Sequence, residues 1–259
     1  MAEAAPYYRE IDGERDLFRR AWQQRLPVLL KGPTGCGKSR FVEAMAHELA
    51  RPLVTVSCHE DTSATDLLGR FLIQGGDTVW QDGPLTRAVK DGAVLYLDEI
   101  AEAREDVVVV IHPLTDHRRQ VYIDKLDTRV QAPPEFILVV SYNPGYQRKV
   151  KELKPSTRQR FVAMSFGYPP RGVEIEIVQE ESGVDAATAK KLVRMGRKIR
   201  GLEELGLTET VSTRLLVYAG KLIAAGVPPR RACGMGIAEP LSDDPDVVQA
   251  VRDLAALVF

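Results

Sequence analysis

Two pairs of polar residues in the sequence are suited to handling a phosphate group. Lys38 and Ser39 end the glycine-rich stretch GPTGCGKS, which covers residues 32–39, and Asp98 and Glu99 form an acidic pair further along. An ammonium group neutralises phosphate charge, whereas hydroxyl and carboxylate oxygens bind Mg²⁺ or orient a water molecule. These residue types predict hydrolysis of a phosphate-containing ligand, provided that the fold brings the two pairs together.

The glycine-rich stretch has the pattern G-x-x-x-x-G-K-[ST] of a phosphate loop. The apolar run at 28–30 predicts a short strand before it, and residues 40–49 have apolar side chains at helical spacing after it. In this context the glycines let successive backbone N–H groups surround phosphate, and the helix adds its positive end. The alternative, an ordinary glycine turn, is disfavoured by these flanking elements. The expected nucleotide-binding residues are Gly32, Pro33, Thr34, Gly35, Cys36, Gly37, Lys38, Ser39 and Arg40.

The acidic pair follows an apolar run at 94–97, which predicts a strand buried on both faces. Ligands of α/β sheets bind at the carboxyl ends of strands, where Asp98 and Glu99 would lie. We expect Asp98, with Ser39, to hold Mg²⁺ partly through its water shell. Glu99 would orient and deprotonate the attacking water. The structural alternative is a negatively charged strand end that caps the next helix.

Two further residues are candidates for contacts with the nucleotide. Asn143 follows a predicted strand at 136–141, and its amide could hydrogen-bond the γ-phosphate or the attacking water. An Asn-Pro turn is the structural alternative. Arg214 begins a predicted helix at 212–225 and could fold back onto the nucleotide, or it could be an exposed residue at the start of a helix.

A pair of arginines, Arg158 and Arg160, stands at the start of a predicted strand at 160–166. An arginine in this position can reach a phosphate across a subunit boundary, where it stabilises the charge of the transferring phosphoryl group. The alternative is a solvated surface pair.

The predicted elements describe an α/β fold. Apolar, β-rich segments alternate with helical segments, which predicts a mostly parallel five-stranded sheet flanked by helices. The predicted strands are residues 28–30, 53–57, 94–97, 136–141 and 160–166, and the predicted helices between them include 14–25, 63–68, 84–90 and 104–117. Two β-hairpins are expected, one at 71–80 around Gly75-Gly76 and one at 120–131.

The character of the chain changes after Pro169-Pro170. No convincing strand follows, and the expected helices are 172–182, 186–200, 212–225, 228–238 and 244–258. We therefore expect an α/β nucleotide-binding core over residues 1–168 and an all-helical lid domain over residues 169–259.

Bulk properties narrow the class of protein. The chain has 259 residues and a formal net charge of −1, so no global basic field attracts nucleic acid. No apolar run approaches the length that crosses a membrane, and the first residues do not form a secretory signal. Three scattered cysteines do not suggest a disulfide framework. A cytoplasmic protein without a nucleic-acid or membrane partner is expected.

The motifs together resemble those of AAA+ ATPases. GPTGCGKS, LYLDE, SYNP, STRQRF and VSTRLL look like the phosphate loop, acidic strand, sensor 1, arginine finger and sensor 2, in that order. The two hairpins match the inserts of the MoxR branch. More narrowly, LLKGPTGCGKSRFVEAMA, DGPLTRAV, VVIHPLTD, VVSYNPGYQ and LKPSTRQRF resemble the CbbQ/NirQ/NorQ group.

This resemblance implies a P-loop NTPase fold with ATP and Mg²⁺ as cofactors. It makes Asn143 sensor 1, Arg214 sensor 2, and Arg160 or Arg158 the arginine finger, with Arg160 preferred. Proteins of this group form hexameric rings and act with an adaptor that carries a von Willebrand factor A domain. Their clients are metal-dependent enzymes: rubisco, from which they release inhibitory sugar phosphates, or nitric oxide or nitrite reductase, whose maturation they assist.

The expected function is ATP-driven remodelling of such a client. Rubisco is the preferred client, because the segment GPTGCGKSRFVEAMA looks most like the carbon-fixation members. A ring scaffold that only binds ATP is an alternative of a different class. A DNA-directed AAA+ protein is a third, but the balanced charge and the missing GAFTGA loop sequence speak against it.

Overall fold

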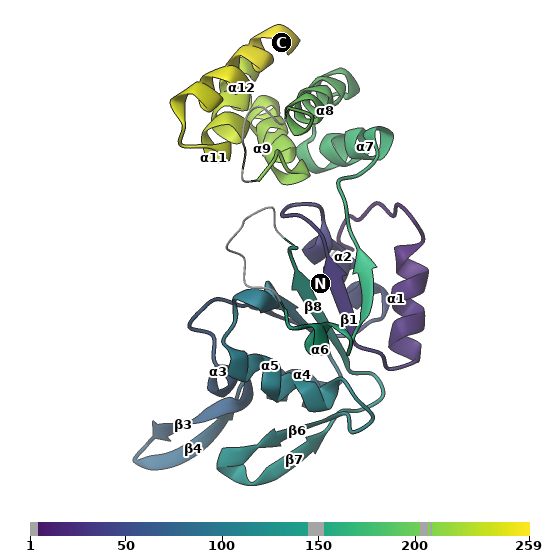
Figure 1. Ribbon diagram of the computed structural model, residues 1–259, viewed down its shortest axis with the longest axis vertical. Coiled ribbons are helices and arrows are strands. Elements are labelled where there is room, and N and C mark those ends of the chain that lie inside the picture. Colours follow the sequence, from purple (N-terminus) through teal and green to yellow (C-terminus); the bar gives the residue numbers. More distant parts are fainter. Residues whose placement is uncertain (1–4, 145–152, 203–206, 208) are drawn as a thin grey trace. The chain divides into compact units, whose positions relative to one another are not determined.

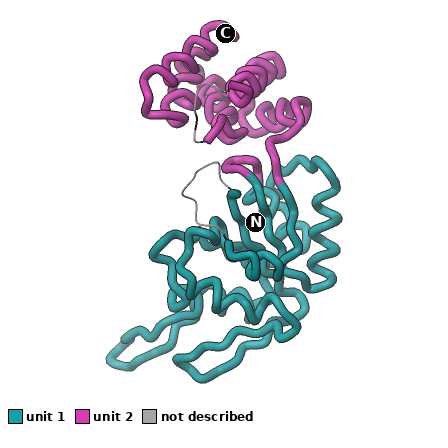
Figure 2. Tube along the Cα trace, in the orientation of Figure 1, with its two compact units in different colours: residues 1–32, 38–144, 149–165 teal, residues 33–37, 145–148, 166–259 magenta. Residues whose placement is uncertain are grey.

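The computed structural model describes residues 5–144, 153–202, 207 and 209–259. They divide into two compact units, coloured separately in Figure 2. Within the described residues, the first unit contains 5–32, 38–144 and 153–165, and the second contains 33–37 and the described part of 166–259. The domain boundary predicted after residue 168 stays a proposal, since compactness alone does not show that a segment folds independently.

The first unit is built on a parallel five-stranded sheet (Figure 1). Its strands are β1 (Val28–Lys31), β2 (Leu53–Ser57), β5 (Val94–Asp98), β8 (Ile137–Tyr142) and β9 (Val162–Ser165), in the spatial order β2-β5-β8-β1-β9. The predicted fold class is confirmed. The connections that follow β1 and β8 lead to opposite sides of the sheet, since β2 lies beyond β8 and β9 lies beyond β1. Open α/β sheets form a ligand crevice at such a switch point.

Six α-helices of the described residues accompany this sheet: α1 (Glu14–Gln23), α2 (Lys38–Glu48), α3 (Ala64–Leu68), α4 (Pro84–Asp91), α5 (Glu105–Ile111) and α6 (Pro155–Arg158). Short 3₁₀ helices occur at η1 (Ile100–Glu102), η2 (His112–Leu114) and η3 (Asp124–Leu126). The prediction of a single helix over 104–117 is therefore wrong, because the α-helix is shorter and a 3₁₀ helix follows it. Pro113 has no backbone N–H and its ring clashes with the preceding turn, so α5 ends and η2 begins there.

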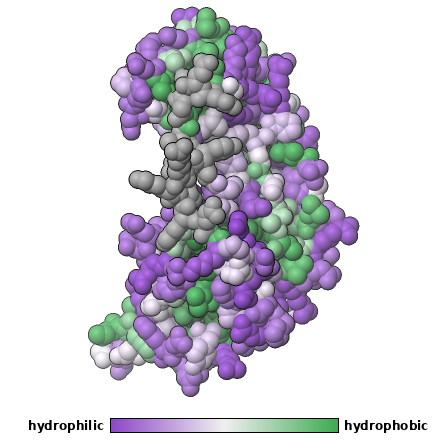
Figure 3. All heavy atoms as spheres, viewed as in Figure 1, coloured by the Kyte–Doolittle hydropathy of each residue, from purple (hydrophilic) through white to green (hydrophobic). Residues whose placement is uncertain are grey.

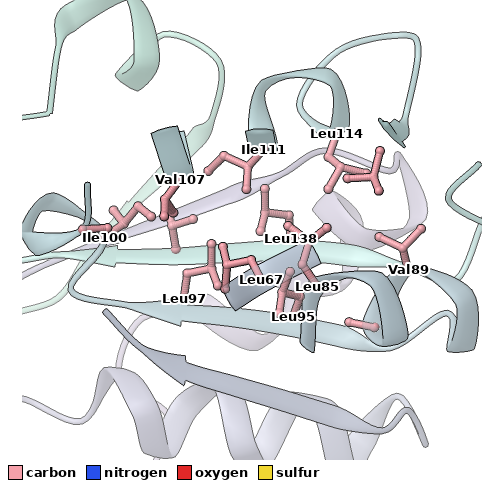
Figure 4. Packing of buried hydrophobic residues seen from close by; sticks show 14 of the residues in the cluster. Leu67, Leu85, Val89, Leu95, Leu97, Ile100, Val107, Ile111, Leu114 and Leu138 are labelled. Atoms are coloured by element: carbon pink, nitrogen blue, oxygen red, sulfur yellow. The ribbon is translucent and has the colours of Figure 1, made fainter. Parts of the chain in front are cut away.

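The side chains of the central strands alternate between the two faces of the sheet. On one face, Leu95 and Leu97 of β5 and Leu138 of β8 pack among buried residues of α3, α4 and α5, which Figure 4 shows at close range. The opposite face carries Tyr96 and Ser141, which are also buried. Both faces are thus buried, but the second one places two hydroxyl groups among its apolar side chains, such as Val94 and Val139.

Two antiparallel hairpins leave the first unit, as predicted. β3 (Gly69–Gln74) pairs with β4 (Asp77–Asp82), and β6 (Gln120–Ile123) pairs with β7 (Thr128–Gln131). Gly75 and Gly76 have φ values of 62° and 95° at the first turn, a conformation that glycine adopts without strain. Ile73 is 81% exposed near this turn, and Figure 3 shows hydrophobic surface over the end of the hairpin.

The second unit is helical. Its helices are α7 (Arg171–Ser182), α8 (Ala186–Arg200), α9 (Thr213–Ala224), α10 (Pro229–Cys233), the π-helix η5 (Gly234–Ala238), α11 (Glu239–Leu241) and α12 (Pro245–Val258). No strand occurs among its described residues. The helix predicted over 228–238 changes to π-helical geometry at Gly234. Gly236 lies against the backbone of Ala219, where a Cβ atom would come within 2.9 Å of the Ala219 nitrogen.

The strand predicted over 160–166 is shorter than expected. Arg160 and Phe161 form a turn in which their N–H groups donate to the carbonyl groups of Thr157 and Arg158, and β9 starts only at Val162. None of the described helices combines the length and apolar character needed to cross a lipid bilayer.

Candidate functional site

The glycine-rich loop runs from the end of β1 to the first turn of α2. Gly35 and Gly37 have φ values of 67° and 104°, in the left-handed region that residues with a Cβ atom rarely adopt. Lys38 is the first residue of α2, and its Nζ atom donates a hydrogen bond to the Gly32 carbonyl oxygen at 2.7 Å. This places the ammonium group at the loop, as a phosphate-binding role requires.

Asp98 is the last residue of β5, at the carboxyl edge of the sheet. Its Oδ1 atom accepts a hydrogen bond from the Tyr96 hydroxyl at 2.6 Å and another from the Ser141 hydroxyl. Burial raises the pKa of Tyr96 far above its ordinary value, and the hydrogen bond to Asp98 raises it further. Tyr96 therefore keeps its proton and stays a donor to Asp98 at any ordinary pH.

Glu99 follows with an exposed side chain and an unusual backbone. Its φ of 55° and ψ of 46° lie in the left-handed region, which is sparsely populated by residues other than glycine. Its N–H donates to Ser141 Oγ at 2.9 Å, and its carbonyl oxygen accepts from the Glu102 N–H at 2.9 Å. These two hydrogen bonds stabilise the left-handed conformation of Glu99. In this conformation the side chain points in a different direction from that of a residue that continues the strand.

A chain of hydroxyl groups connects the loop to the acidic pair. Ser39 Oγ lies 3.4 Å from the Tyr96 hydroxyl, which in turn contacts Asp98. Side chains two residues apart on a strand share a face, so Tyr96 and Asp98 both point to the side on which Ser39 lies, in the first turn of α2. The structure thus brings Ser39 and Asp98, both predicted magnesium ligands, into one network.

Asn143 lies directly after β8. The Gly32 N–H donates to the carbonyl oxygen of Tyr142 at 3.2 Å, so the residue before Asn143 is bonded to the start of the loop. β8 also pairs with β5, which carries Asp98. Asn143 therefore stands at the same sheet edge as the loop and the acidic pair.

The two candidate finger arginines lie elsewhere. Arg158 ends α6 and Arg160 lies in the turn before β9, whose first residue pairs with Val28 at the start of β1. The loop leaves β1 at its other end, after Lys31. Because the strands are parallel, Arg158 and Arg160 sit at the amino edge of the sheet and the loop of the same chain sits at the carboxyl edge.

Arg160 is held in place by an ion pair. Its Nη1 atom lies 3.6 Å from Asp116 Oδ2. Hydrogen bonds from Arg118 lower the pKa of Asp116 to about 2, so this carboxylate stays ionised as Arg160's partner throughout the physiological range. The neighbouring His112 has a lowered pKa, mainly because of burial and also because of the Arg160 charge.

Arg214 is the second residue of α9, which begins after the N-cap residue Ser212. The loop residue Gly35 belongs to the same compact unit. A Cβ atom added to Gly35 would lie 2.6 Å from the Ser212 Cβ and 3.3 Å from the Arg214 Cβ. Within this unit, the start of α9 therefore packs against the middle of the glycine-rich loop.

Comparison with known proteins agrees with this geometry. Residues 27–161 match the family described as AAA domain (dynein-related subfamily), and residues 174–258 match the one described as CbbQ/NirQ/NorQ C-terminal. The chain belongs to the CbbQ/NirQ/NorQ family of AAA ATPases. Its ATPase class and its nucleotide-binding fold follow from this membership.

Members of the CbbQ/NirQ/NorQ family match nearly the whole chain. The denitrification regulatory protein NirQ of Stutzerimonas stutzeri is 55% identical, over 98% of this chain and 93% of the relative. Protein CbbQ of Hydrogenophilus thermoluteolus is 56% identical, over 100% of this chain and 97% of the relative. Protein NorQ of Paracoccus denitrificans is also 56% identical, over 98% and 94%.

Solved structures confirm the AAA fold at lower similarity. A RuvB variant from Thermotoga maritima superposes with a TM-score of 0.57 at 16% identity, covering 93% of this chain and 68% of that chain. A putative ATPase from Cytophaga hutchinsonii has a TM-score of 0.51 at 15% identity, covering 93% and 81%. At these identities the likeness concerns the fold alone.

The residues of this CbbQ/NirQ/NorQ-family ATPase fit a magnesium nucleotide. The loop offers left-handed glycines, an ammonium group and the start of a helix, which together suit a chain of phosphates. The Ser39 hydroxyl and the Asp98 carboxylate offer the oxygen ligands that Mg²⁺ prefers, and Tyr96 ties them together. Both side-chain hydrogen bonds to Asp98 end on its Oδ1 atom.

Sequence analysis missed Tyr96 and Ser141. A signal for Tyr96 was present, since it is a polar residue two positions before Asp98 in an otherwise apolar strand. Ser141 gave no such signal, because its neighbourhood depends on the register between β5 and β8. That register pairs Leu97 with Val140 and so puts Ser141 beside Asp98.

Proposed function

We propose that this ATPase hydrolyses Mg²⁺-ATP at the loop and acidic pair, and that it uses the reaction to remodel a metal-dependent client enzyme. In this proposal Lys38 neutralises the β- and γ-phosphates, while Ser39 and Asp98 hold Mg²⁺. Glu99 orients and deprotonates the attacking water. The observation that carries the proposal is the network from Ser39 through Tyr96 to Asp98 and, through Ser141, to Glu99.

Asn143 and Arg214 complete the part of the proposed site that one chain supplies. Asn143 senses the γ-phosphate or the attacking water, a role that its place beside the loop supports. Arg214 contacts the nucleotide from the helical unit, and its packing near Gly35 supports this role.

Arg160, assisted by Arg158, acts as a finger on the nucleotide of a neighbouring subunit. The support is topological, because both arginines lie at the opposite sheet edge from the loop of their own chain.

The proposed assembly is a homo-hexameric ring that works with an adaptor carrying a von Willebrand factor A domain. A finger that acts in trans requires a ring or another head-to-tail assembly, since each subunit then completes the site of the next. The adaptor and the number of subunits follow from the resemblance to the family, and a cytoplasmic location is a further part of the proposal.

The proposed client is rubisco, from which the ATPase releases inhibitory sugar phosphates. The name of the relative CbbQ gives no client, whereas NirQ is named as a denitrification regulatory protein. The similarities of the chain to NirQ, CbbQ and NorQ are nearly equal, so nitric oxide or nitrite reductase is the alternative client. An ATP-gated scaffold without hydrolysis is the alternative of another class.

Substitution of the proposed base separates an enzyme from a scaffold. Glu99→Gln should retain ATP binding and ring assembly but lose turnover by about 10²–10⁴-fold, the usual contribution of a general base. Glu102→Gln is a matched control, because Glu102 is an exposed acid three residues away. Client activation that persists in Glu99→Gln would support the scaffold, and unimpaired ATP hydrolysis would contradict the assignment of Glu99.

The client is tested by reconstitution. The ATPase and its adaptor are mixed with inhibited rubisco or with immature nitric oxide reductase, with and without ATP, and client activity is measured. The proposal expects ATP-dependent recovery of rubisco that Glu99→Gln abolishes. Recovery of the reductase alone would assign the protein to denitrification instead.

A further inference from the structure

Ser141 is a polar side chain inside the sheet that belongs to the network of the proposed site but has been given no role of its own. It lies on β8 and has no exposed surface. A buried hydroxyl group is costly unless it forms hydrogen bonds, so its partners show what it contributes. Ser141 bonds to both members of the acidic pair, at Asp98 Oδ1 and at the backbone N–H of Glu99, and the Tyr96 hydroxyl is a further neighbour.

The direction of both hydrogen bonds follows from the chemistry of the groups. A backbone N–H can only donate, so the Ser141 oxygen accepts from Glu99 at 2.9 Å. The single hydroxyl proton of Ser141 is then available for Asp98 Oδ1, which also accepts from the Tyr96 hydroxyl. Ser141 thus accepts a hydrogen bond from the backbone of Glu99 and donates one to the carboxylate of Asp98.

The peptide group that joins Asp98 to Glu99 is held at both of its polar atoms. Its carbonyl oxygen, on Asp98, accepts from the Cys58 N–H at 2.9 Å, and its N–H is the group that donates to Ser141. Cys58 follows β2 and Ser141 lies on β8, so the two strands that flank β5 hold this peptide between them. Rotation of the peptide would break both bonds at once.

The position of this peptide sets the direction of the Glu99 side chain. Glu99 has a left-handed backbone, and an extended conformation would point its carboxylate to the other side of the strand end. The Ser141 bond is one of the contacts that stabilise the left-handed form. Its loss would leave the Glu99 N–H without this partner in a partly buried setting and would remove one of the two donors to Asp98 Oδ1.

We propose that the Ser141 hydroxyl is a positioning group that fixes the Asp98 carboxylate and the Glu99 backbone in one arrangement. This inference rests on the proposed function, since it assigns to Ser141 the alignment of the magnesium-binding and base residues. Ser141 itself does not touch the substrate. Threonine retains the hydroxyl group, whereas alanine removes both hydrogen bonds and keeps the size of the residue close to that of serine.

Ser141→Ala is expected to impair the chemical step and magnesium binding without loss of the fold. The turnover number should fall about 10- to 100-fold, the effect of losing a hydrogen bond to a charged group. The Mg²⁺ concentration that half-saturates binding of a fluorescent, non-hydrolysable ATP analogue should rise about three- to tenfold, because Asp98 is less well oriented. Ser141→Thr should restore most of both quantities.

Ser182→Ala is the matched control. Ser182 is also a buried serine, and its hydroxyl donates to the Val178 carbonyl in the helical unit. This variant should leave the turnover number and the Mg²⁺ dependence unchanged. Thermal unfolding of all three variants measures how much of any effect comes from lost stability.

Two results would overturn the inference. One is Ser141→Ala with wild-type turnover and wild-type Mg²⁺ dependence. The other is a loss of turnover that matches the loss of folded protein while the Mg²⁺ dependence is unchanged, which would make Ser141 purely structural. Glu99→Gln is assayed in parallel: if it still hydrolyses ATP, the assignment of the base fails, while the Mg²⁺ titration still tests the contact of Ser141 with Asp98.

Discussion

Gly37 and Glu99, like Gly35, are residues of the candidate site with backbone conformations that most side chains disfavour. Gly37 has a φ of 104° in the loop, and Glu99 has a φ of 55° after β5. Glycine takes its conformation without a Cβ clash, whereas Glu99 is stabilised by hydrogen bonds to its N–H and carbonyl groups. Strained backbone of this kind concentrates at functional sites, where the surrounding structure enforces it.

At the residue scale, Gly37→Ala should weaken nucleotide binding more than it weakens the fold. Alanine cannot adopt φ near 104° without strain, so the loop would shift its N–H groups away from the phosphates. We expect a loss of ATP affinity of about tenfold or more, on the scale of one or two hydrogen bonds to a charged group. Equilibrium binding of a fluorescent ATP analogue measures this effect.

Gly183→Ala is the control for backbone strain alone. Gly183 follows α7 with a φ of 75°. A Cβ atom added to Gly183 or to Gly37 would have no other atom within 4 Å. Both variants should lose about 1 kcal/mol of unfolding free energy, the cost of a left-handed residue with a side chain. Equal changes in ATP affinity for the two variants would contradict a special role for Gly37.

At the scale of elements, a buried ion pair organises the helical unit. Arg200 on α8 donates to both carboxylate oxygens of Glu174 on α7, at 2.9 and 2.7 Å, and its Nε atom donates to the Val211 carbonyl. Thr213, at the start of α9, donates to Glu174 Oε1 at 2.7 Å. This network fixes the start of the helix that carries Arg214.

Arg200→Ala should therefore destabilise the protein strongly. Glu174 is fully buried, and removal of one partner of a buried ion pair costs about 3–5 kcal/mol because the other charge is left uncompensated. Arg197→Ala is the control, since Arg197 is exposed on the same last turn of α8 and should change stability by less than about 0.5 kcal/mol. Urea unfolding followed by circular dichroism measures the stability of both variants. Similar unfolding midpoints for Arg200→Ala and Arg197→Ala would contradict a stabilising role of this network.

At the scale of the whole molecule, the two halves of the proposed site lie at opposite edges of one sheet. The loop and acidic pair are at the carboxyl edge, and Arg160 and Arg158 are at the amino edge. A single chain therefore does not bring its own finger arginines to its own loop. The proposal of a shared site between subunits follows from this parallel topology.

Mixing two inactive variants tests the shared site. Arg160→Ala should lower turnover about 10³-fold or more, and Lys38→Ala should abolish nucleotide binding. In rings mixed at equal amounts, about a quarter of the interfaces would combine an intact loop with an intact finger, so about a quarter of wild-type ATPase activity should return. Steady-state ATP hydrolysis at several mixing ratios measures the recovery.

The same experiment with Arg158→Ala identifies the finger. If Arg160 is the finger and Arg158 only assists, Arg158→Ala alone should retain more activity than Arg160→Ala alone. Absence of recovery at every mixing ratio would argue against action between subunits. The ion pair of Arg160 with Asp116 predicts that Asp116→Asn also lowers turnover, though less than Arg160→Ala does.

The sequence alone determined the features that depend on neighbouring residues. The loop follows from glycine spacing between an apolar run and a helical pattern, and the turn at Gly75-Gly76 follows from residues that tolerate positive φ. The three central strands β1, β5 and β8 were predictable because buried parallel strands are short, continuous apolar runs. Ends of helices were less certain, as the break at Pro113 and the π-helix at Gly234 illustrate.

Only the tertiary structure decided how the acidic pair is held. Asp98 and Ser141 are 43 residues apart in the chain, and they meet because β5 and β8 pair in one register. A shift of this register by one residue would turn Ser141 to the opposite face and remove it from Asp98. The sequence by itself therefore specified which chemical groups the site contains, whereas strand pairing, a long-range interaction, specified their contacts.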